Sequence, residues 1–292
     1  MNIALLANPT AGKGRRAGLL PEVVARLEAG GHAVDVVTAT SRDGMIEQGR
    51  AAVAGGRAVV AMGGDGTVHL GLQAVAGTGA AFGIVPAGTG NDFAVRLGLP
   101  DDTLQAADTI ARSTTTRAVD LAKVTGGDGT TAWFGAVMAA GFDAFVNERA
   151  NRMRWPRGPQ RYNLAIVAEL LALRSRRYTM SLDNERRVFD SVLVAIGNTE
   201  SYGGGFRIVP GADPTDGLLD VVVAEPLNRR TLMRLRPKVF KGTHVLDPRV
   251  STYRARTVEL AAEGVTGYAD GERICPLPVT ITCVPGALRL IA

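Results

Sequence analysis

Three glycine-rich segments near the start of the chain contain the residue types that bind phosphate groups. They are Asn8-Pro9-Thr10-Ala11-Gly12-Lys13-Gly14, Gly63-Gly64-Asp65-Gly66-Thr67 and Pro86-Ala87-Gly88-Thr89-Gly90-Asn91-Asp92. Glycine lets backbone N–H groups approach an anion closely, and the N-terminus of a following helix adds favourable partial charge. Each segment separates a strand-like apolar stretch from a helix-like one. Three such loops in succession favour a nucleotide polyphosphate as the ligand.

The individual segments leave different alternatives open. The first is not a P-loop, because Gly14 stands where a Ser or Thr is needed, so it is either a phosphate loop or a plain tight turn. In the second, Asp65 could hold Mg²⁺ or a hydroxyl group, and the alternative is an Asx-type turn that caps the following helix. In the third, Thr89 could bond a phosphate, while Asn91 or Asp92 would cap a helix.

The second half of the chain offers two carboxylate-bearing segments. Asp213-Pro214-Thr215-Asp216-Gly217-Leu218 places two carboxylates beside main-chain carbonyls, which suits a hard cation, but Asp-Gly is also a common hairpin turn. Tyr268-Ala269-Asp270-Gly271-Glu272 is either a hairpin turn or a site that carries a general base. The run Gly203–Gly205 requires unusual backbone angles or close backbone approach, without indicating to what.

The elements that must position the glycine loops alternate between strands and helices. Hydrophobic spacing predicts four strands and four intervening or following helices. The strands are Asn2–Ala7, Val34–Val37, Ala58–Met62 and Ala81–Val85, and the helices are Arg15–Gly30, Asp43–Ala54, Thr67–Ala76 and one that begins near Asp92. Repeated strand–helix units predict a parallel sheet covered on both faces, with ligands beyond the carboxyl ends of its strands.

Beyond about residue 120 the pattern becomes dominated by strands. Turns separate strand-like stretches, with one long helix near Tyr162–Arg174. The expected strands are Thr131–Val137, Tyr178–Leu182, Val188–Ile196, Leu218–Val223, Val258–Leu260, Val265–Tyr268 and Val279–Val284. We therefore predict an α/β nucleotide domain over residues 1–120 and a β-rich domain, similar to a β-sandwich, over residues 121–283.

Composition limits the class of protein. The chain has 292 residues, of which 46% are hydrophobic and 21% charged, which excludes global disorder. Two cysteines are too few for a disulfide framework, and no run approaches the roughly 20 apolar residues of a membrane span. The formal charge of +5 favours an anionic partner. Nucleic acid is not expected, because aromatic residues are sparse and no reader motif is present. A cytoplasmic protein is expected.

Together these motifs resemble the soluble bacterial diacylglycerol kinase family, which also includes sphingoid-base kinases and related lipid kinases. The resemblance runs in order through nearly the whole chain. Its motifs are Asn8-Pro9 with Gly12, Gly63–Thr67, Gly88–Asp92, Tyr202–Gly205, Asp216–Leu218 and Gly271-Glu272. The Gly-Gly-Asp-Gly-Thr loop alone is shared with NAD kinases and 6-phosphofructokinases, so the combination carries the resemblance.

The resemblance implies an ATP- and Mg²⁺-dependent kinase that phosphorylates a lipid primary hydroxyl, most simply that of diacylglycerol. It implies an α/β domain followed by a β-sandwich, with the terminal strand, about residues 284–292, returning to the first domain. Glu272 matches the proton acceptor, Asp65 would help to place metal or acceptor, and Asp216 with the main chain of Asp213 and Leu218 matches a structural Mg²⁺ site. The residues implied to hold ATP are Asn8, Pro9, Gly12, Thr40, Gly63, Gly64, Asp65, Gly66, Thr67, Gly88 and Thr89.

Other functions fit parts of the pattern. A sphingoid-base or other lipid-alcohol kinase differs only in its acceptor pocket. An NAD kinase shares the Asp65 loop but not the Gly88–Asp92 and Tyr202–Leu218 segments. A catalytically inactive nucleotide-binding regulator would be expected to have lost Asp65 or Glu272. The sequence does not fix the oligomeric state, and a homodimer is one possible assembly.

Two basic segments suggest transient contact with the inner face of a membrane. Neither contains an acidic residue, and each interleaves cations with apolar side chains, so the alternative is an ordinary solvated basic face. The first is Arg149, Arg152, Arg154, Arg157 and Arg161 around Trp155, and the second is Arg229, Arg230, Arg234, Arg236, Lys238 and Lys241 with Leu232, Met233 and Leu235.

Overall fold

The computed structural model describes residues 1–7, 17–153, 155 and 159–292. These residues divide into two compact units. The first comprises Met1–Leu121, Pro214–Asp216 and Val284–Ala292, and the second comprises Ala122–Asp213 and Gly217–Cys283. The first glycine-rich segment, with Asn8, Pro9 and Gly12, lies outside the described residues.

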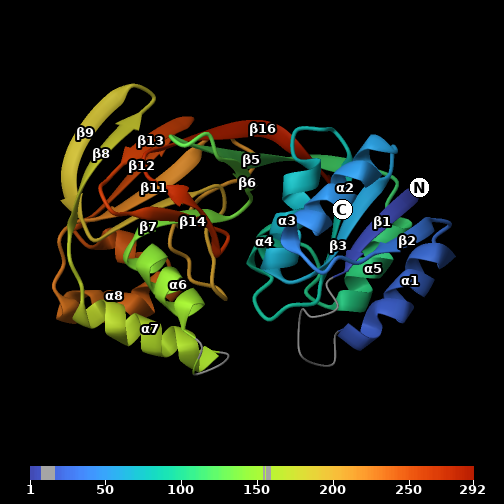
Figure 1. The fold of residues 1–292 in the computed structure, drawn as a ribbon, viewed down its shortest axis with the longest axis horizontal. Coiled ribbons are helices and arrows are strands. Elements are labelled where there is room, and N and C mark those ends of the chain that lie inside the picture. The colour runs from blue at the N-terminus through green and yellow to red at the C-terminus, as the bar shows by residue number, and fades with distance from the viewer. Residues whose placement is uncertain (8–16, 154, 156–158) are drawn as a thin grey trace. The chain divides into compact units, whose positions relative to one another are not determined.

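A parallel sheet forms the centre of the first unit (Figure 1). Its strands follow the order β2-β1-β3-β4, and the last part of β16 (Val279–Ile291) lies beside β4, where Arg289 pairs with Ala81 and Leu290 with Phe82. Because all four strands run in the same direction, their carboxyl ends meet at one edge of the sheet. The four strands are β1 (Asn2–Ala7), β2 (Ala33–Val37), β3 (Ala58–Gly63) and β4 (Ala81–Pro86).

Helices cover both faces of this sheet. On one face, Ile3 and Leu5 pack in a core cluster with α1 (Leu20–Ala29) and α5 (Thr103–Arg112). The alternate residue Leu6 points to the opposite face, toward Gly49 in α2 (Arg42–Ala54), which packs against α3 (Asp65–Val75). Short elements complete the unit, namely a 3₁₀ turn at Ala17–Leu19 and α4 (Asp92–Arg96).

The second unit is a β-sandwich. Met138 and Ile196 from one sheet pack against Tyr178 and Ile281 from the other. The first sheet has the order β12 (Val250–Ala255), β11 (Leu219–Ala224), β10 (Leu193–Gly197), β7 (Val137–Gly141), β14 (Thr266–Ala269) and β15 (Glu272–Pro276). The second contains β16, β13 (Thr257–Ala261), β8 (Arg176–Leu182) and β9 (Glu185–Ser191), with β5 (Thr116–Gly126) and β6 (Thr131–Phe134).

The described residues of the second unit form three α-helices. Leu235 of α8 (Arg229–Phe240) is buried in a cluster with Val137 and Val222, on the face of the six-stranded sheet that points away from the sandwich core. The helices α6 (Phe142–Arg152) and α7 (Pro159–Leu171) pack against each other. A 3₁₀ turn, Thr243–Leu246, follows α8.

The expected order of an α/β domain and then a β-sandwich-like domain is confirmed, two expected strands were wrong and three helices were missed. Val188–Ile196 is not one strand, because the chain passes from β9 to β10 at Ser191, whose hydroxyl donates to the carbonyls of Leu193 and Ala224. Thr131–Val137 is likewise divided between β6 and β7. The helices α5, α6 and α8 were not expected. Among the described residues, no helix combines the length and apolar composition needed to cross a membrane.

Candidate functional site

The predicted nucleotide residues that the structure describes lie at the carboxyl edge of the parallel sheet. Thr40 follows β2 and is exposed, Gly63 ends β3, and Thr89 follows β4 and is also exposed. Gly66 belongs to the first turn of α3, and Thr67 is buried against Gly63. The sheet therefore brings these residues to the edge where ligands bind in proteins of this class.

Two of the glycine loops touch each other through their backbones. A Cβ atom at Gly88 would lie 2.4 Å from the Cα of Gly64, and one at Gly64 would lie 3.2 Å from the Cα of Gly88. The N–H of Ala87 also donates to the carbonyl of Gly63 at 2.8 Å. Glycine is therefore required here by contact between the loops, a reason that the sequence did not reveal.

Two carboxylates flank Gly90 beside this contact. A Cβ at Gly90 would lie 2.7 Å from Oδ2 of Asp65 and 3.5 Å from Oδ2 of Asp92. Oδ1 of Asp65 accepts a long hydrogen bond, 3.5 Å, from the N–H of Phe93. Mg²⁺ prefers oxygen ligands and is commonly held by one or two carboxylates together with substrate phosphates, so this donor set fits that ion.

Neither Asp65 nor Asn91 caps a helix in the way that the sequence suggested. Among the described residues, no side chain caps α3, whose N-cap is Gly64, so Asp65 does not form an Asx-type cap. Asn91 occupies the N-cap position of α4 with a left-handed φ of 56°, but its side chain bonds elsewhere. Its Oδ1 accepts from Gly88 N–H at 3.1 Å, and its Nδ2 donates to Asp101 at 2.9 Å. Asn91 therefore closes the Gly88 loop instead of capping a helix.

In the second unit, Glu272 follows a tight hairpin turn. Asp270 and Gly271 have φ values of 52° and 82°, as a two-residue type I′ turn requires. The Asp270 carboxylate accepts from the N–H groups of Gly135 at 3.1 Å and Ala136 at 2.9 Å. These bonds tie the turn to the segment that enters β7. The partly buried Glu272 is thus held at the start of β15, so the hairpin and the general-base interpretations are compatible.

A partly buried pair, Asp143 and Tyr202, lies where β7 meets α6, and sequence reasoning missed its carboxylate. The Tyr202 hydroxyl donates to Asp143, the second residue of α6. Exclusion of water raises the pKa of Asp143 to about 6, although the hydrogen bond from Tyr202 lowers it. Burial, and then the charge of Asp143, raise the pKa of Tyr202 well above its usual value. The signal available was Gly141-Phe142-Asp143, a polar side chain directly after an apolar strand.

The glycine run after Tyr202 has the unusual backbone angles that the sequence predicts. Gly203, Gly204 and Gly205 all have positive φ, at 65°, 83° and 96°. An isolated bridge joins Tyr202 to Phe206 across them. The run therefore turns the chain back on itself next to the Asp143–Tyr202 pair.

The segment proposed for a structural metal is exposed. Asp213 and Asp216 are both on the surface, and the carbonyl of Pro214 accepts from the N–H of Asp120 at 2.7 Å. The segment is not a tight hairpin turn, because residues 198–218 separate β10 from its partner β11. Within the described part of the chain, no three His, Cys, Asp or Glu side chains are grouped to hold a metal ion.

Family models match both halves of the chain. The diacylglycerol kinase catalytic domain matches residues 2–124, and the YegS C-terminal NAD kinase beta sandwich-like domain matches residues 136–292. A crystal structure of a Bacillus anthracis protein has the same fold, with a TM-score of 0.82 at 22% sequence identity, over 99% of this chain and 94% of that one.

Relatives with assigned names are similar over most of their length. A Mycobacterium tuberculosis protein named diacylglycerol kinase is 44% identical over 99% of this chain and 94% of its own. A Stenotrophomonas maltophilia protein named as a YegS-like lipid kinase is 32% identical over 80% of this chain and 77% of its own. The chain therefore belongs to the family of diacylglycerol kinase-like lipid kinases.

Proposed function

We propose that this enzyme transfers the γ-phosphate of ATP to the primary hydroxyl of diacylglycerol and so forms phosphatidic acid. The observation that carries this choice of acceptor is the 44% identity, over nearly the full length of both chains, to the protein named diacylglycerol kinase. The choice of ATP is supported by the loops at one edge of the parallel sheet. A sphingoid base or another lipid alcohol is the second candidate for the acceptor.

The first unit would bind the nucleotide. Gly63–Thr67, Gly88, Thr89 and Thr40 offer backbone N–H and hydroxyl groups at the carboxyl edge of the sheet, and the uncapped start of α3 favours negative charge. Asn8, Pro9 and Gly12 follow β1 in the sequence and belong to the same proposal. The contact between Gly64 and Gly88 would hold the two loops in a fixed arrangement before the nucleotide arrives.

Mg²⁺ would be held by Asp65, with Asp92 as its neighbour, and a second ion by Asp216 with the main chain of Asp213 and Leu218. Bound Mg²⁺ neutralises the charge that develops on the phosphate groups. Asp92 was not among the residues predicted from the sequence, and it enters because its carboxylate approaches the same position as that of Asp65.

The second unit would supply the proton acceptor and bind the lipid. Glu272 would accept the proton of the attacking hydroxyl, and the turn at Asp270 would keep its carboxylate in place. Such a base contributes roughly 10²–10⁴-fold to a rate. Phosphoryl transfer depends mainly on positioning and charge neutralisation. A turn that fixes the position of Glu272 would therefore favour the reaction.

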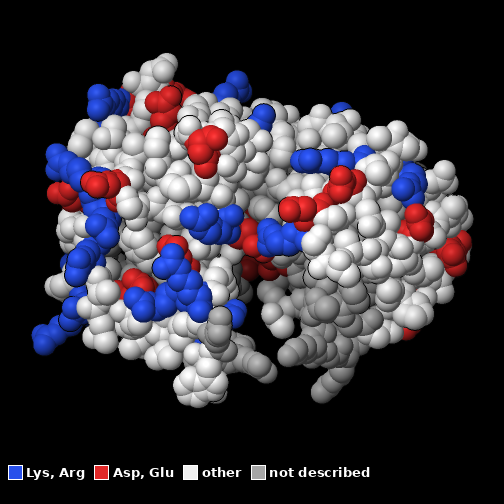
Figure 2. All heavy atoms as spheres, viewed as in Figure 1, with Lys and Arg blue, Asp and Glu red and all other residues white. Residues whose placement is uncertain are grey.

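Contact with an anionic membrane would be made by α7 and α8. On α8, Arg230, Arg234 and Lys238 are exposed, whereas on α6 the guanidinium groups of Arg149 and Arg152 bond to Glu169 and Glu148. In Figure 2, Lys and Arg gather along the left edge of the second unit, where Figure 1 shows β8, β9 and α8. Basic residues contribute about 1 kcal/mol each near an anionic surface.

An apolar stripe on α7 supports the same contact. Leu164, Val167 and Leu171 are 45%, 52% and 62% exposed, and their spacing of three and four residues puts them on one side of the helix. Trp155, which precedes α7, is 80% exposed. Because ATP is the proposed donor, we place this contact on the cytoplasmic leaflet.

Transfer of labelled phosphate tests the proposed reaction. The full chain is incubated with γ-labelled ATP and Mg²⁺, together with a total lipid extract or, separately, with NAD, and the products are separated by thin-layer chromatography. A labelled band that migrates with phosphatidic acid is the expected result. A labelled band at the position of a different lipid would identify that lipid as the acceptor in place of diacylglycerol. Label in NADP alone would overturn the proposal. A parallel sample with EDTA should lose the label.

A further inference from the structure

A pocket of about 170 Å³ opens in the second unit between α6, α7 and the start of β8. Phe142 and Phe145 come from α6, Glu169 from α7, Arg174 from the connection between α7 and β8, and Arg176 from the first position of β8 (Arg176–Leu182). None of these residues belongs to the proposed ATP site or to the Glu272 hairpin. The pocket is therefore a separate feature of the second unit.

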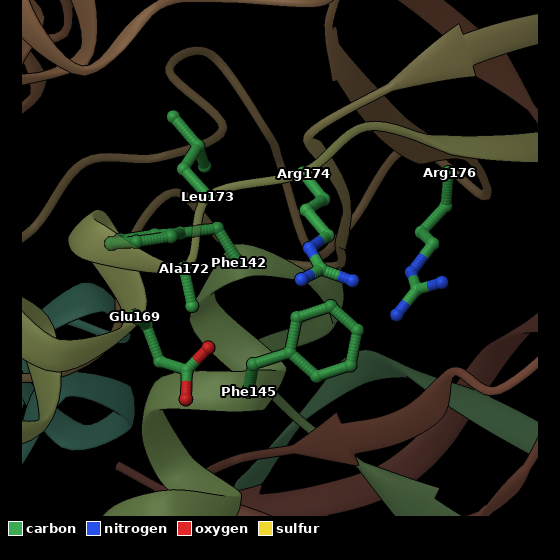
Figure 3. A pocket seen from close by; sticks show the side chains of 7 residues that line it. All are labelled: Phe142, Phe145, Glu169, Ala172, Leu173, Arg174 and Arg176. Carbon is green, nitrogen blue, oxygen red and sulfur yellow. The ribbon is translucent and has the colours of Figure 1, made fainter.

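Two guanidinium groups converge on one phenyl ring in this pocket. Arg174 and Arg176 both point toward Phe145, and Glu169 faces the same space from α7 (Figure 3). The guanidinium carbon of Arg176 lies 5.8 Å from the centre of the Phe145 ring. Arg176 begins β8 and Arg174 lies two residues before it, and both side chains leave the chain toward Phe145 in Figure 3.

The cations of the pocket are not balanced by its one carboxylate. Glu169 is bonded by Arg149, and the adjacent Arg177, which leaves the other side of the strand, pairs with Asp190 at 3.5 Å. Among the described residues, no carboxylate lies within ion-pair distance of Arg174 or Arg176. Two like charges held toward one space are stabilised by an anion between them.

The remaining lining is apolar. Phe142, Phe145, Ala172 and Leu173 offer carbon surface beside the two guanidinium groups. The exposed Leu171 immediately precedes this lining and belongs to the apolar stripe of α7. An occupant that joins a small anionic group to a hydrocarbon chain would satisfy both parts, since its charge would meet the arginines and its chain the carbon surface.

We propose that this pocket binds the phosphate group of one anionic phospholipid, with Arg174 and Arg176 as its ligands and the rings of Phe142 and Phe145 against the first carbons of the lipid. The occupant is a lipid phosphate, not free phosphate, because the apolar wall stabilises only a chain-bearing molecule. That this lipid can be the reaction's own product rests on the proposed function, whereas the binding itself does not.

Equilibrium binding of a soluble short-chain lipid to the full chain, without ATP, tests the proposal. Isothermal titration calorimetry would use dioctanoylphosphatidate below its micelle concentration as the probe. Glycerol 3-phosphate supplies the same phosphate without chains, and dioctanoylglycerol supplies the chains without phosphate. The probe is expected to bind at least about tenfold more tightly than glycerol 3-phosphate, and equal affinity for glycerol 3-phosphate would overturn the proposal.

Two variants that alter the pocket in different ways test whether the probe binds there. R174Q/R176Q removes the charges, and A172F fills the pocket from an exposed position while keeping the charges. Each is expected to weaken binding by about tenfold or more. The matched control R177Q/R186Q removes two neighbouring charges and should change affinity less than twofold. Similar losses in both double variants, or no loss in A172F, would mean that general surface charge binds the probe.

Competition separates this site from the proposed active site. Excess dioctanoylglycerol should leave probe binding to the pocket unchanged, and displacement of all bound probe would place it in the acceptor site and overturn the inference. Phosphate transfer is measured separately on the same R174Q/R176Q protein. Absence of transfer in the wild-type chain would refute the proposed function without affecting the calorimetric result.

Discussion

Two hairpins of the second unit have the same local structure and different surroundings. Asp270-Gly271-Glu272 joins β14 to β15, and Asp183-Asn184-Glu185 joins β8 to β9. In each, two residues with positive φ form the turn and a glutamate begins the second strand. In each, the turn aspartate accepts two N–H groups of a neighbouring segment, those of Gly135 and Ala136 or those of Arg256 and Thr257.

The surroundings of the two glutamates differ. The Glu185 side chain is 75% exposed and pairs with Arg187 at 3.0 Å. Glu272 is partly buried on the edge strand of the six-stranded sheet. The same turn chemistry therefore presents one glutamate to solvent and another to a protein environment. The local turn geometry fixes the backbone position of a glutamate in both hairpins. Only the tertiary surroundings distinguish a candidate base from a solvated side chain.

Replacing the glutamates should give the largest difference between the two hairpins. We expect Glu272→Gln to lower turnover by about 10²–10⁴-fold with little change in ATP affinity, because the proton acceptor is lost and the nucleotide site is untouched. Glu185→Gln should leave turnover unchanged. Steady-state kinetics with diacylglycerol in mixed micelles measures both. Equal activity of the two variants would remove Glu272 from its proposed role.

The surroundings of Asp143 predict that the stability of the protein depends on pH, in contrast to those of an exposed carboxylate. Its pKa of about 6 exceeds the ordinary value of 3.8, so the folded state holds its proton more tightly than the unfolded state. The stabilising contribution is complete below about pH 3.8 and is lost as the pH rises through 6.

Asp143→Asn, which cannot titrate, should therefore gain stability relative to wild type as the pH rises from 4 to 7, by about 2 kcal/mol. Urea denaturation of both proteins across this pH range measures the difference. Asp190→Asn makes the same substitution at an exposed carboxylate and controls for the effect of the substitution itself. A constant difference between Asp143→Asn and wild type would show that the pKa of Asp143 is ordinary.

Substituting the aspartate of each turn should lower the stability of the protein in both hairpins but its activity in only one. Asp183→Asn and Asp270→Asn each replace one acceptor oxygen by an NH₂ group, so one N–H group loses its acceptor and we expect each to lose about 1 kcal/mol of unfolding free energy. Only Asp270→Asn should also lower turnover, by about tenfold or more, because a small displacement of Glu272 disturbs the reacting geometry. Denaturation midpoints and kinetics at a temperature where both variants are folded distinguish the two effects.

The second turn position should give the smallest effect. Gly271→Ala places a Cβ at a φ of 82° and should cost about 1 kcal/mol, although no atom lies within 4 Å of the new methyl group. Asn184→Gly, at 81°, should change the free energy of unfolding by only a few tenths of a kcal/mol. A larger loss in Asn184→Gly than in Gly271→Ala would contradict the equivalence of the two turns.

The four parallel strands of the α/β part were predictable to within a few residues, whereas its helix α5 was not expected. The apolar runs of β3 and β4 end in glycine and proline, and the helix α2 begins and ends within one residue of the expected range. Regular spacing and turn chemistry are local properties, so the sequence displays them directly. The same local chemistry indicated the Asp270-Gly271 turn and the positive φ values at Gly203–Gly205.

What could not be predicted depends on contacts between distant residues. The passage from β9 to β10 at Ser191 follows from hydrogen bonds to Ala224, which is not adjacent in sequence. Asp143 lies in a stretch without a motif, and its pKa is raised because folding shields it from water, an effect that the hydrogen bond from Tyr202 partly offsets. The sequence suggested that Gly88 lets the backbone approach a phosphate group. Its contact with Gly64 depends on how the two loops pack in the folded structure, which the sequence does not show.

The pairing of β16 with β4 has a consequence for synthesis of the chain. Strand β4 ends at Pro86, and its neighbour on one side is formed by residues near Arg289. At about 5–20 residues per second, the ribosome needs roughly 10–40 s to make the chain between them. During that time the apolar strand β4, with Phe82, Ile84 and Val85, presents an unpaired edge. We expect chaperones to bind a nascent chain in this state. Stalled translation, or loss of residues 284–292, would leave β4 with its unpaired edge and so produce an aggregation-prone protein as well as a shortened one.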